Sequence, residues 1–153
     1  MTGDAKTSGC VFCEAQHNEQ SSLIVFYGRT AFVILNLYPY NNGHLMVIPM
    51  RHLASLVDAT PDELSEMMAL TRRAEIALRE AYSPHGLNMG INLGKPAGAG
   101  VLDHVHMHVV PRWNGDTNFI TVVGETRVLA EELPVTAARL KPIFERLEAT
   151  ERN

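Results

Sequence analysis

The chain has 153 residues, of which 46% are hydrophobic and 20% charged, and its formal net charge is −4 with neutral histidines. A chain of this length can form one domain that buries roughly two-thirds of its unfolded surface. The sequence has no cluster of Lys or Arg. We therefore expect no nucleic-acid polymer as a partner, because such polyanions are normally bound by a basic face. A small anionic ligand, held by a few polar groups, is compatible with this charge.

The sequence shows neither an export signal nor a membrane-spanning run. The first ten residues are small and polar, unlike a signal peptide. The longest apolar stretches have about five residues, against the roughly 20 that a spanning helix needs. We therefore expect a cytoplasmic protein with no membrane partner. In that compartment the only two cysteines, Cys10 and Cys13, stay reduced.

The first half of the chain predicts three strands that follow one another closely. Leu23–Gly28 and Ala31–Asn36 are rich in β-branched and aromatic residues, and the two residues between them indicate a hairpin. Turn-forming residues follow over Tyr38–His44, and Leu45–Met50 is a third predicted strand. Connections this short cannot carry a parallel crossover, so we expect antiparallel pairing.

A long helix is predicted after these strands. Thr60 can cap it, Pro61 suits the first helical position, and Glu63 completes a capping box. Apolar residues then recur at helical spacing from Leu64 to Ala81, until the sequence Ser-Pro-His-Gly ends the pattern.

The second half predicts two strands, joined by a Gly/Ala loop, and a final helix. Leu87–Gly94 is the fourth predicted strand, and the histidine-rich run His104–Arg112 is the fifth. Phe119–Gly124 has the composition of a further short strand. Val135–Thr150 has helical spacing, but Pro142 must kink this helix or begin a new one. The order of elements predicts an α+β fold with a mostly antiparallel five-stranded sheet, one long helix and a C-terminal helix.

Three histidines alternate along the fifth predicted strand. The side chains of His104, His106 and His108 are therefore expected on one face. From the strand rise, the Cα atoms of the outer two would lie roughly 13 Å apart. An imidazole places a zinc ion within about 6.5 Å of its own Cα, so the outer pair could share a metal only where the middle histidine stands. We therefore expect the three histidines to have different roles.

Cys10 and Cys13 form a CxxC motif. In a reducing compartment this motif indicates half of a zinc site or a redox-active dithiol. The redox interpretation calls for a preceding βαβ pattern, whereas only a short polar leader precedes this motif. Zinc needs two more ligands, for which His52 and one histidine of the run are candidates. By itself the motif is equally compatible with a zinc site and with no function.

One signature fits the histidine run at every position: His-φ-His-φ-His-φ-φ, with φ apolar, over "HVHMHVV" (His104–Val110). The run thus resembles the signature of the histidine-triad (HIT) nucleotide hydrolases and transferases. The likeness extends through "LNLYPYNNGHLMVIPMRH" and "NLGKPAGAG" to the CxxC, over roughly residues 10–113. It implies a single HIT domain over residues 1–153, with residues 114–153 as its C-terminal extension. The most similar branch acts on dinucleoside polyphosphates such as diadenosine tetraphosphate (Ap4A).

The resemblance implies catalytic roles for three histidines. His106 would attack the α-phosphorus of the substrate and form a nucleotidyl-histidine intermediate, because neutral imidazole is a good nucleophile near pH 7. His108 would hydrogen-bond the phosphate oxygens, and His44 would lie beside the triad and orient it.

The same resemblance implies a structural zinc ion, no organic cofactor and a homodimer. The implied zinc ligands are Cys10, Cys13, His52 and His104. The implied substrate-binding residues are Asn36 at the ribose, Asn92 and Gly100 at the phosphates, Phe12 and Leu37 along the base pocket, and Arg112 at the phosphate chain. Each side chain of the second set has a structural alternative: the asparagines are typical of turns, the two apolar residues of a core, and the arginine of a surface ion pair.

One departure from the family pattern leaves the reaction open. Many members carry Gln or Ser shortly before the first histidine, where this chain has Gly100 and Val101. Backbone N–H groups of this loop can still hold an anion, so water and phosphate both stay open as acceptor. We expect a nucleotidyl hydrolase or phosphorylase acting on a dinucleoside polyphosphate or a related nucleotide conjugate. The alternatives are a nucleoside phosphoramidate hydrolase, a nucleotide-binding regulatory protein with incidental turnover, and a metalloenzyme that uses two of the triad histidines.

Overall fold

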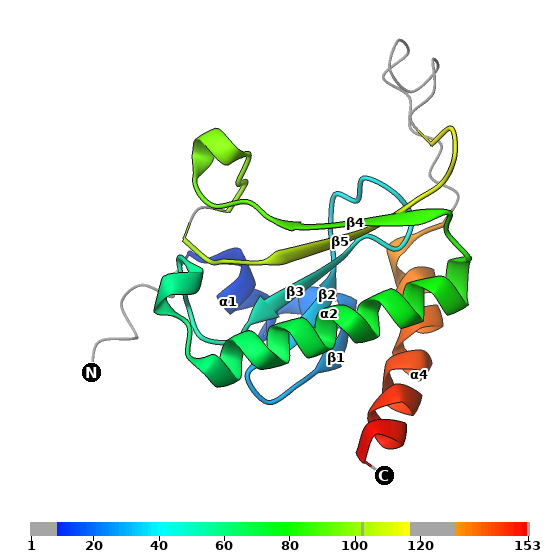
Figure 1. Cartoon of the computed structure of the whole chain (residues 1–153), viewed down its shortest axis with the longest axis horizontal. Helices are drawn as coiled ribbons and strands as arrows, with labels where there is room; N and C mark the ends of the chain where they lie inside the picture. Colours follow the sequence, from blue (N-terminus) through cyan, green and yellow to red (C-terminus); the bar gives the residue numbers. More distant parts are fainter. Residues whose placement is uncertain (1–8, 102, 117–130, 153) are drawn as a thin grey trace.

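A five-stranded antiparallel sheet forms the centre of the computed structural model, which describes residues 9–101, 103–116 and 131–152 (Figure 1). The strands lie in the order β1-β2-β3-β5-β4, and each neighbouring pair is antiparallel. Their bounds are β1 Ile24–Tyr27, β2 Ala31–Leu35, β3 Leu45–Pro49, β4 Gly86–Ile91 and β5 Met107–Arg112. The predicted α+β class and five-stranded sheet are confirmed.

The long helix α2, Pro61–Tyr82, begins as predicted and runs across the sheet (Figure 1). The Thr60 hydroxyl accepts a hydrogen bond from the Glu63 backbone N–H, and the Glu63 carboxylate accepts one from the Thr60 N–H. This reciprocal pair satisfies two donors that an uncapped helix would leave without a partner. Ser83 ends the helix in the left-handed conformation, with φ 47°.

A carboxylate of α2 holds the turn between β1 and β2. Glu66 accepts hydrogen bonds from the backbone N–H groups of three successive residues: Arg29 at 3.1 Å, Thr30 at 2.6 Å and Ala31 at 2.8 Å. Hydrogen bonds to the charged form stabilise it, and they lower the pKa of Glu66 although burial acts in the opposite direction. The hairpin is therefore fixed to the helix as well as to its own ladder.

The C-terminal helix α4, Leu133–Arg152, is continuous through Pro142, and packs against α2 and β1 (Figure 1). Pro142 lacks the N–H that would bond to the carbonyl of Ala138. Ala138 is exposed, so water can satisfy that carbonyl instead. Three side chains of α4 enter the same core as α2 and the sheet: Ala137, Leu140 and Phe144.

Several short elements complete the described chain. The helix α1, Val11–Ala15, was not predicted and contains the second cysteine of the CxxC motif. Three 3-10 helices are η1 Glu19–Leu23, η2 Leu56–Asp58 and η3 Lys95–Ala97. The predicted strand Phe119–Gly124 lies outside the described residues. Among the described helices, none combines the length and apolar character needed to cross a membrane.

The fifth strand corrects one prediction about the histidine run. β5 begins at Met107, so His104 and His106 precede it and only His108 lies on the strand. The reason is the backbone just before the strand: the N–H of Val105 donates to the carbonyl of Leu53 at 2.7 Å. This bond replaces a sheet ladder there. The three rings nevertheless follow one another, since Phe12 contacts those of His104 and His106, and the ring of His106 lies 4.8 Å from that of His108.

Candidate functional site

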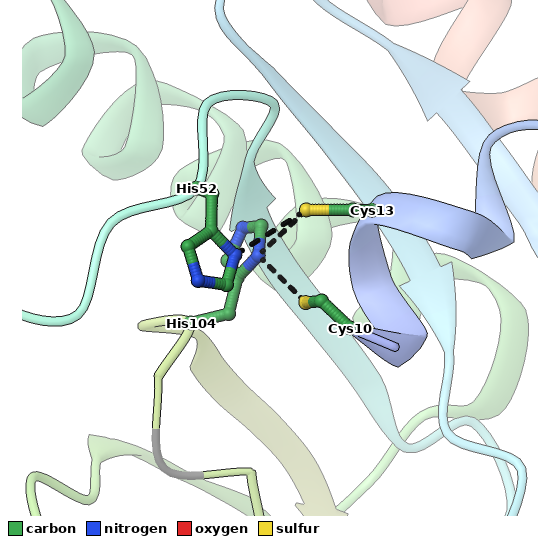
Figure 2. A group of neighbouring side chains, drawn as sticks. All are labelled: Cys10, Cys13, His52 and His104. Atoms are coloured by element: carbon green, nitrogen blue, oxygen red, sulfur yellow. Dashed lines mark hydrogen bonds between the residues drawn. The ribbon is translucent and has the colours of Figure 1, made fainter. Parts of the chain in front are cut away.

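Four side chains from three distant parts of the chain converge at one end of the sheet. Figure 2 shows Cys10 and Cys13 of the α1 segment facing two imidazoles, His52 and His104. One ligand atom from each residue lies within 4.8 Å of all the others. The structure thus brings together the four residues for which a zinc site was predicted.

The distances within this cluster suit a small tetrahedral cation. Nδ1 of His104 lies 3.3 Å from Sγ of Cys10 and 3.6 Å from Sγ of Cys13, and Nδ1 of His52 lies 3.4 Å from Sγ of Cys13. Zinc bonds near 2.3 Å to sulfur and 2.05 Å to nitrogen put tetrahedral S and N ligands about 3.6 Å apart. The spacing of the donor atoms therefore fits zinc.

The protonation of His104 also suits a ligand. Its Nε2–H donates to the carbonyl of Pro49 at 2.8 Å, because a carbonyl can only accept. A neutral ring then has its lone pair on Nδ1, the atom that faces the cysteines, and burial lowers the pKa of His104 and keeps the ring neutral. A hydrogen bond on the far ring nitrogen is the usual partner of a metal-bound histidine.

The two thiols fit the same interpretation. Burial, together with the neighbouring Cys10, raises the pKa of Cys13 to about 12. Two adjacent thiolates are therefore unfavourable unless a cation compensates their charge, as a bound zinc ion does. Both cysteines are free thiols.

An ion pair holds the backbone beside His52. The guanidinium of Arg51 donates to the carboxylate of Glu63, at 2.7 Å, and to the carbonyl of Asp58, at 3.0 Å. Glu63 also caps α2, so the start of this helix fixes the segment that carries His52. Hydrogen bonding to Arg51 lowers the pKa of Glu63 and keeps it charged.

His106 lies next to the cluster and has a defined tautomer. Its Nδ1–H donates to the carbonyl of His104 at 2.9 Å, so the lone pair of the neutral ring is on Nε2. The residue is 4% exposed, and burial lowers the pKa of His106 below its ordinary value of 6.5. At neutral pH this ring therefore presents an unprotonated nitrogen, which a nucleophile requires.

A chain of hydrogen bonds fixes the tautomer of His108. The backbone N–H of Tyr40 donates to Nδ1 of His44 at 3.2 Å, so the proton of the neutral His44 ring is on Nε2. This Nε2 lies 2.9 Å from Nδ1 of His108 and donates to it. The proton of a neutral His108 is then on Nε2, where it can bond an oxygen atom of a ligand. Burial, aided by His106, lowers the pKa of His108 to about 4, so the ring is neutral at pH 7.

Gly43 places the fully buried His44. Its φ of +80° lies in the left-handed region that favours glycine, and a Cβ at this position would lie 2.9 Å from Cδ2 of Leu78 and 3.2 Å from the ring of Tyr82. The chain can therefore pass close to α2 just before His44 only because position 43 has no side chain.

The loop before His44 contains two of the predicted substrate residues. Asn36 is half-buried, with its Nδ2 3.4 Å from Nε2 of His44, and its Oδ1 accepts a hydrogen bond from the N–H of Tyr38. It thus forms a turn and also lies beside the histidines. Leu37 is exposed.

Tyr40 is a residue of the site that was not predicted. The residue is 55% exposed, and its ring lies 4.7 Å from the ring of His44 and 6.2 Å from that of His108, centroid to centroid. The signal was available in the sequence, since an aromatic residue in the middle of a turn-forming stretch is uncommon.

Three more of the predicted substrate residues lie in α1 and in the loop after β4. Phe12 is buried in α1, and its ring centroid is 4.9 Å from that of His106. Asn92 is half-buried and Gly100 exposed, in the loop between β4 and the histidine run. In this loop a Cβ on Gly98 would lie 3.9 Å from Nδ2 of Asn92, at ordinary van der Waals distance.

Arg112 makes the ion pair that was its structural alternative. Its guanidinium donates to both carboxylate oxygens of Asp116, at 2.6 and 2.8 Å, and to Oδ1 of Asn88 at 2.9 Å. Asp116 also accepts from the side chain of Asn41 and the N–H of Trp113. Hydrogen bonding to Arg112 holds the pKa of Asp116 well below its usual range. Asp116 was not predicted, because it lies in the turn after β5, where a spacing of four residues does not bring two side chains together as it does on a helix.

Comparison with known proteins agrees with this geometry. The model of the HIT domain family matches residues 17–115. The chain is 46% identical over 118 residues to a Mycobacterium tuberculosis protein named AP-4-A phosphorylase. This alignment covers 77% of this chain and 60% of that protein. It is 37% identical over 93 residues to the asymmetrical bis(5'-nucleosyl)-tetraphosphatase of Schizosaccharomyces pombe. This alignment covers 60% of this chain and 50% of that protein. The chain thus spans 50–60% of the length of these curated relatives.

The fold is shared with solved structures over nearly the whole chain. A crystal structure of a zinc-bound histidine triad family protein from Mycobacterium smegmatis superimposes with a TM-score of 0.76 at 30% identity, covering 94% of this chain and 99% of that one. With the match to residues 17–115, this shows that the chain belongs to the HIT domain family.

Proposed function

We propose that the protein is a nucleotidyl hydrolase or phosphorylase that cleaves a dinucleoside polyphosphate, such as Ap4A, at an α-phosphate through a nucleotidyl-histidine intermediate. The observation that carries this proposal is the tautomer of His106. Its Nδ1–H is bonded to the His104 carbonyl, so Nε2 has the lone pair that attack on phosphorus requires. The names of the two curated relatives, a phosphorylase and a tetraphosphatase, support the substrate class.

In this proposal His108 and His44 act on the phosphate. His108 donates from Nε2 to an oxygen of the phosphoryl group, where negative charge accumulates as the bond to His106 forms. His44 keeps His108 in the donating tautomer through the 2.9 Å contact between their ring nitrogens. In the first step the bond between the α-phosphorus and the bridging oxygen breaks, and the rest of the polyphosphate leaves, which is ATP when the substrate is Ap4A. A second step transfers the nucleotidyl group from His106 to water or to inorganic phosphate and regenerates the neutral ring.

The remaining substrate contacts follow the family pattern. Asn36, half-buried beside His44, hydrogen-bonds the ribose, and Phe12 and Leu37 line the base pocket. Asn92 and the Gly100 loop bind the phosphates. For Arg112 we propose a contact to the distal part of the phosphate chain, made while the guanidinium stays anchored on Asp116.

We also propose that Cys10, Cys13, His52 and His104 bind one structural zinc ion. The convergence of the four donor atoms, the Nδ1 lone pair of His104 and the raised pKa of Cys13 support it. The zinc-bound protein from Mycobacterium smegmatis shows that a zinc ion occurs in this fold. The bound ion supplies charge compensation for the two thiolates and joins α1 to the ends of β3 and β5.

Two further expectations concern the whole protein. We infer a homodimer, supported by the position of β4 at the edge of the sheet and by the exposed side chains of Met89 and Leu93 there. We also infer a single domain over residues 1–153, because α4 shares one core with α2 and the sheet. A cytoplasmic location, which we also infer, suits thiolate ligands because thiols stay reduced there.

Turnover of a substrate panel tests the reaction. The panel contains Ap4A, Ap3A and a nucleoside phosphoramidate, each with and without inorganic phosphate. We expect the dinucleoside polyphosphates to be cleaved fastest, and acid-quenched enzyme to carry a labelled nucleotidyl group. With Ap4A the leaving group is ATP in either reaction, so ADP in place of AMP as the second product when phosphate is present identifies phosphorolysis. Ap3A releases ADP as its leaving group in both cases, and for it the replacement of AMP by a second ADP is the criterion. Preference for the phosphoramidate, or stoichiometric binding without turnover of any substrate, would contradict the proposal.

A further inference from the structure

We propose that the cysteine–histidine cluster (Cys10, Cys13, His52 and His104) positions His106 through two contacts, and that Phe12 makes one of them. The cluster then has a part in the reaction beyond stability, and Phe12 is a positioning residue in addition to a wall of the base pocket. This inference rests on the proposed role of His106 as the nucleophile.

The first contact is the backbone of a cluster residue. The carbonyl of His104 accepts the Nδ1–H of His106 at 2.9 Å, while the side chain of the same residue points its Nδ1 at the two cysteines. The His104 ring is held on its other side by the carbonyl of Pro49. His104 thus contributes its ring to the cluster and its carbonyl to the bond that fixes the His106 tautomer, so a shift of its main chain on loss of the cluster would also displace that carbonyl.

The second contact is the ring of Phe12, which stands between the two cysteines in the sequence. Its centroid lies 5.6 Å from that of His104, edge to face at 84°, and 4.9 Å from that of His106. A tilted ring at this distance restricts the χ1 and χ2 rotations of the imidazole. The same aromatic ring therefore packs on a cluster ligand and on the proposed nucleophile.

The helix that carries Phe12 depends on the cluster for its place. α1 has only five residues, far fewer than an isolated helix needs to be stable in water. Its N-cap residue, Cys10, makes no side-chain capping hydrogen bond. Ligation of Cys10 and Cys13 would fix α1 on both sides of Phe12. The occupancy of the cluster therefore adds to the core packing of Phe12 and Ala15 in setting the position of this ring.

A role limited to the base pocket makes a different prediction. A pocket residue contacts His106 only incidentally, so its removal raises KM for the nucleotide and leaves the His106 ring of the nucleotide-free protein unchanged. A positioning residue alters that ring before any substrate binds. The state of His106 without nucleotide therefore separates the two roles.

The experiment measures ¹⁵N chemical shifts of the His106 ring at one fixed pH, in zinc-loaded, nucleotide-free protein. In the wild type we expect a protonated Nδ1 and an unprotonated Nε2. In Phe12→Ala we expect both shifts to move toward the average of the two tautomers, with Phe12→Leu intermediate. Val11→Ala is the matched control, since Val11 is an exposed neighbour on the same helix, and it should give the wild-type spectrum.

A second variant changes the cluster without touching His106. The side chain of His52 contacts two other members of the cluster, Cys13 and the ring of His104. In His52→Ala we expect weaker zinc binding and a displacement of the His106 shifts in the same direction as in Phe12→Ala. Phe12→Ala and His52→Ala disturb the same packing around His106. The double variant should therefore displace the His106 shifts by less than the sum of the two single displacements.

Single-turnover kinetics complete the test. We expect Phe12→Ala to slow formation of the nucleotidyl-enzyme about 10- to 100-fold at saturating substrate, as a misplaced reacting group does. Unchanged His106 shifts in folded Phe12→Ala would overturn the positioning role, whatever its KM. If the wild type itself forms no nucleotidyl-enzyme with any substrate, the proposed function fails, and the nucleotide-free spectra still decide the positioning of His106.

Discussion

Nε2 of His44 lies 2.9 Å from Nδ1 of His108, and the backbone N–H of Tyr40 occupies the other nitrogen of His44. A backbone amide cannot accept a proton, so this amide sets the tautomers of two rings in succession. The main chain of a loop thus determines which nitrogen of His108 carries the proton. A backbone N–H is held more rigidly in this role than a second side chain would be.

Replacing His44 tests this arrangement. In His44→Leu the Nδ1 of His108 loses its donor, both tautomers of His108 become populated, and we expect turnover to fall about 10²-fold, at the lower end for a lost acid–base group. His44→Gln places an amide N–H near the position of Nε2, so it should recover part of the loss. Steady-state kcat on Ap4A measures both. Equal activity of the Gln and Leu variants would contradict a role for the donated proton.

The depressed pKa of His108 predicts a pH dependence of stability. Its pKa is about 4 in the folded protein and 6.5 ordinarily, so between these values the unfolded chain binds more protons at this site. The contribution of neutral His108 is complete above pH 6.5 and is lost as the pH falls toward 4, with a slope of at most about 1.4 kcal/mol per pH unit. Urea unfolding of wild type and His108→Asn from pH 4.5 to 7.5 measures the difference in slope.

That comparison contains its own control. Protons also compete with metal at the cysteine–histidine cluster, but this effect is present in both proteins and cancels in the difference. We expect the stability of the wild type to fall more steeply than that of His108→Asn below pH 6.5. Parallel curves would show that His108 titrates near its ordinary value in the folded protein.

Gly43→Ala should lower the free energy of unfolding by roughly 1–3 kcal/mol. A left-handed conformation costs an L-residue about 1–2 kcal/mol, and the new Cβ would also lie 2.9 Å from Leu78. Gly86→Ala is the matched control, because Gly86 has no atom within 4 Å of the added Cβ and is not among the glycines with positive φ. Urea denaturation distinguishes them, and equal stabilities would show that the chain at position 43 adapts without cost.

The elements that the sequence predicted well are those whose cause is local. Thr60, Pro61 and Glu63 determine the start of α2 within four residues, and the structure has the predicted capping box. The hairpin of β1 and β2 follows likewise from two adjacent apolar runs. Features caused by distant contacts were missed: the turn of this hairpin is held by Glu66 of α2, which no local pattern indicates.

The histidine run shows the same limit at the site. Alternation along a strand was a sound expectation from sequence, but the carbonyl of Leu53 binds the N–H of Val105 and delays β5 until Met107. The grouping of Cys10 and Cys13 with two particular histidines came from the family resemblance, since spacing alone left several partners open. Tautomers depend on which backbone group faces each ring nitrogen, and the sequence does not contain that information.

Removing metal should destabilise the protein. We expect one zinc per chain after purification without added metal, and a lower melting temperature after chelation, because the cluster joins α1 to the ends of β3 and β5. Where zinc is present at about 100 times its Kd, linkage predicts about 2.7 kcal/mol of stabilisation. Elemental analysis and thermal melts measure both. Cys13→Ser should lose the metal, whereas replacement of the exposed His17 by Ala should not.

The last prediction concerns His106. If it attacks phosphorus, the reaction has two chemical steps, and water or phosphate enters only in the second. His106→Ala should then lose turnover by on the order of 10³-fold or more, as loss of a nucleophile does in other enzymes. It should keep its affinity for AMP, since Asn36, His108 and the loop amides remain. Isothermal titration and single-turnover assays separate the two effects.

His106→Gly is the sharper variant, because the space left by the ring can admit added imidazole. Wild-type enzyme quenched with acid after mixing with labelled substrate should carry label that is lost in acid and stable in alkali, as expected of a phosphoramidate. In His106→Gly that covalent label should be absent, while added imidazole restores part of the first step and releases a nucleotidyl-imidazole. Retention of more than a few per cent of wild-type turnover by His106→Ala would favour direct attack by an activated water molecule, and would exclude His106 as the nucleophile.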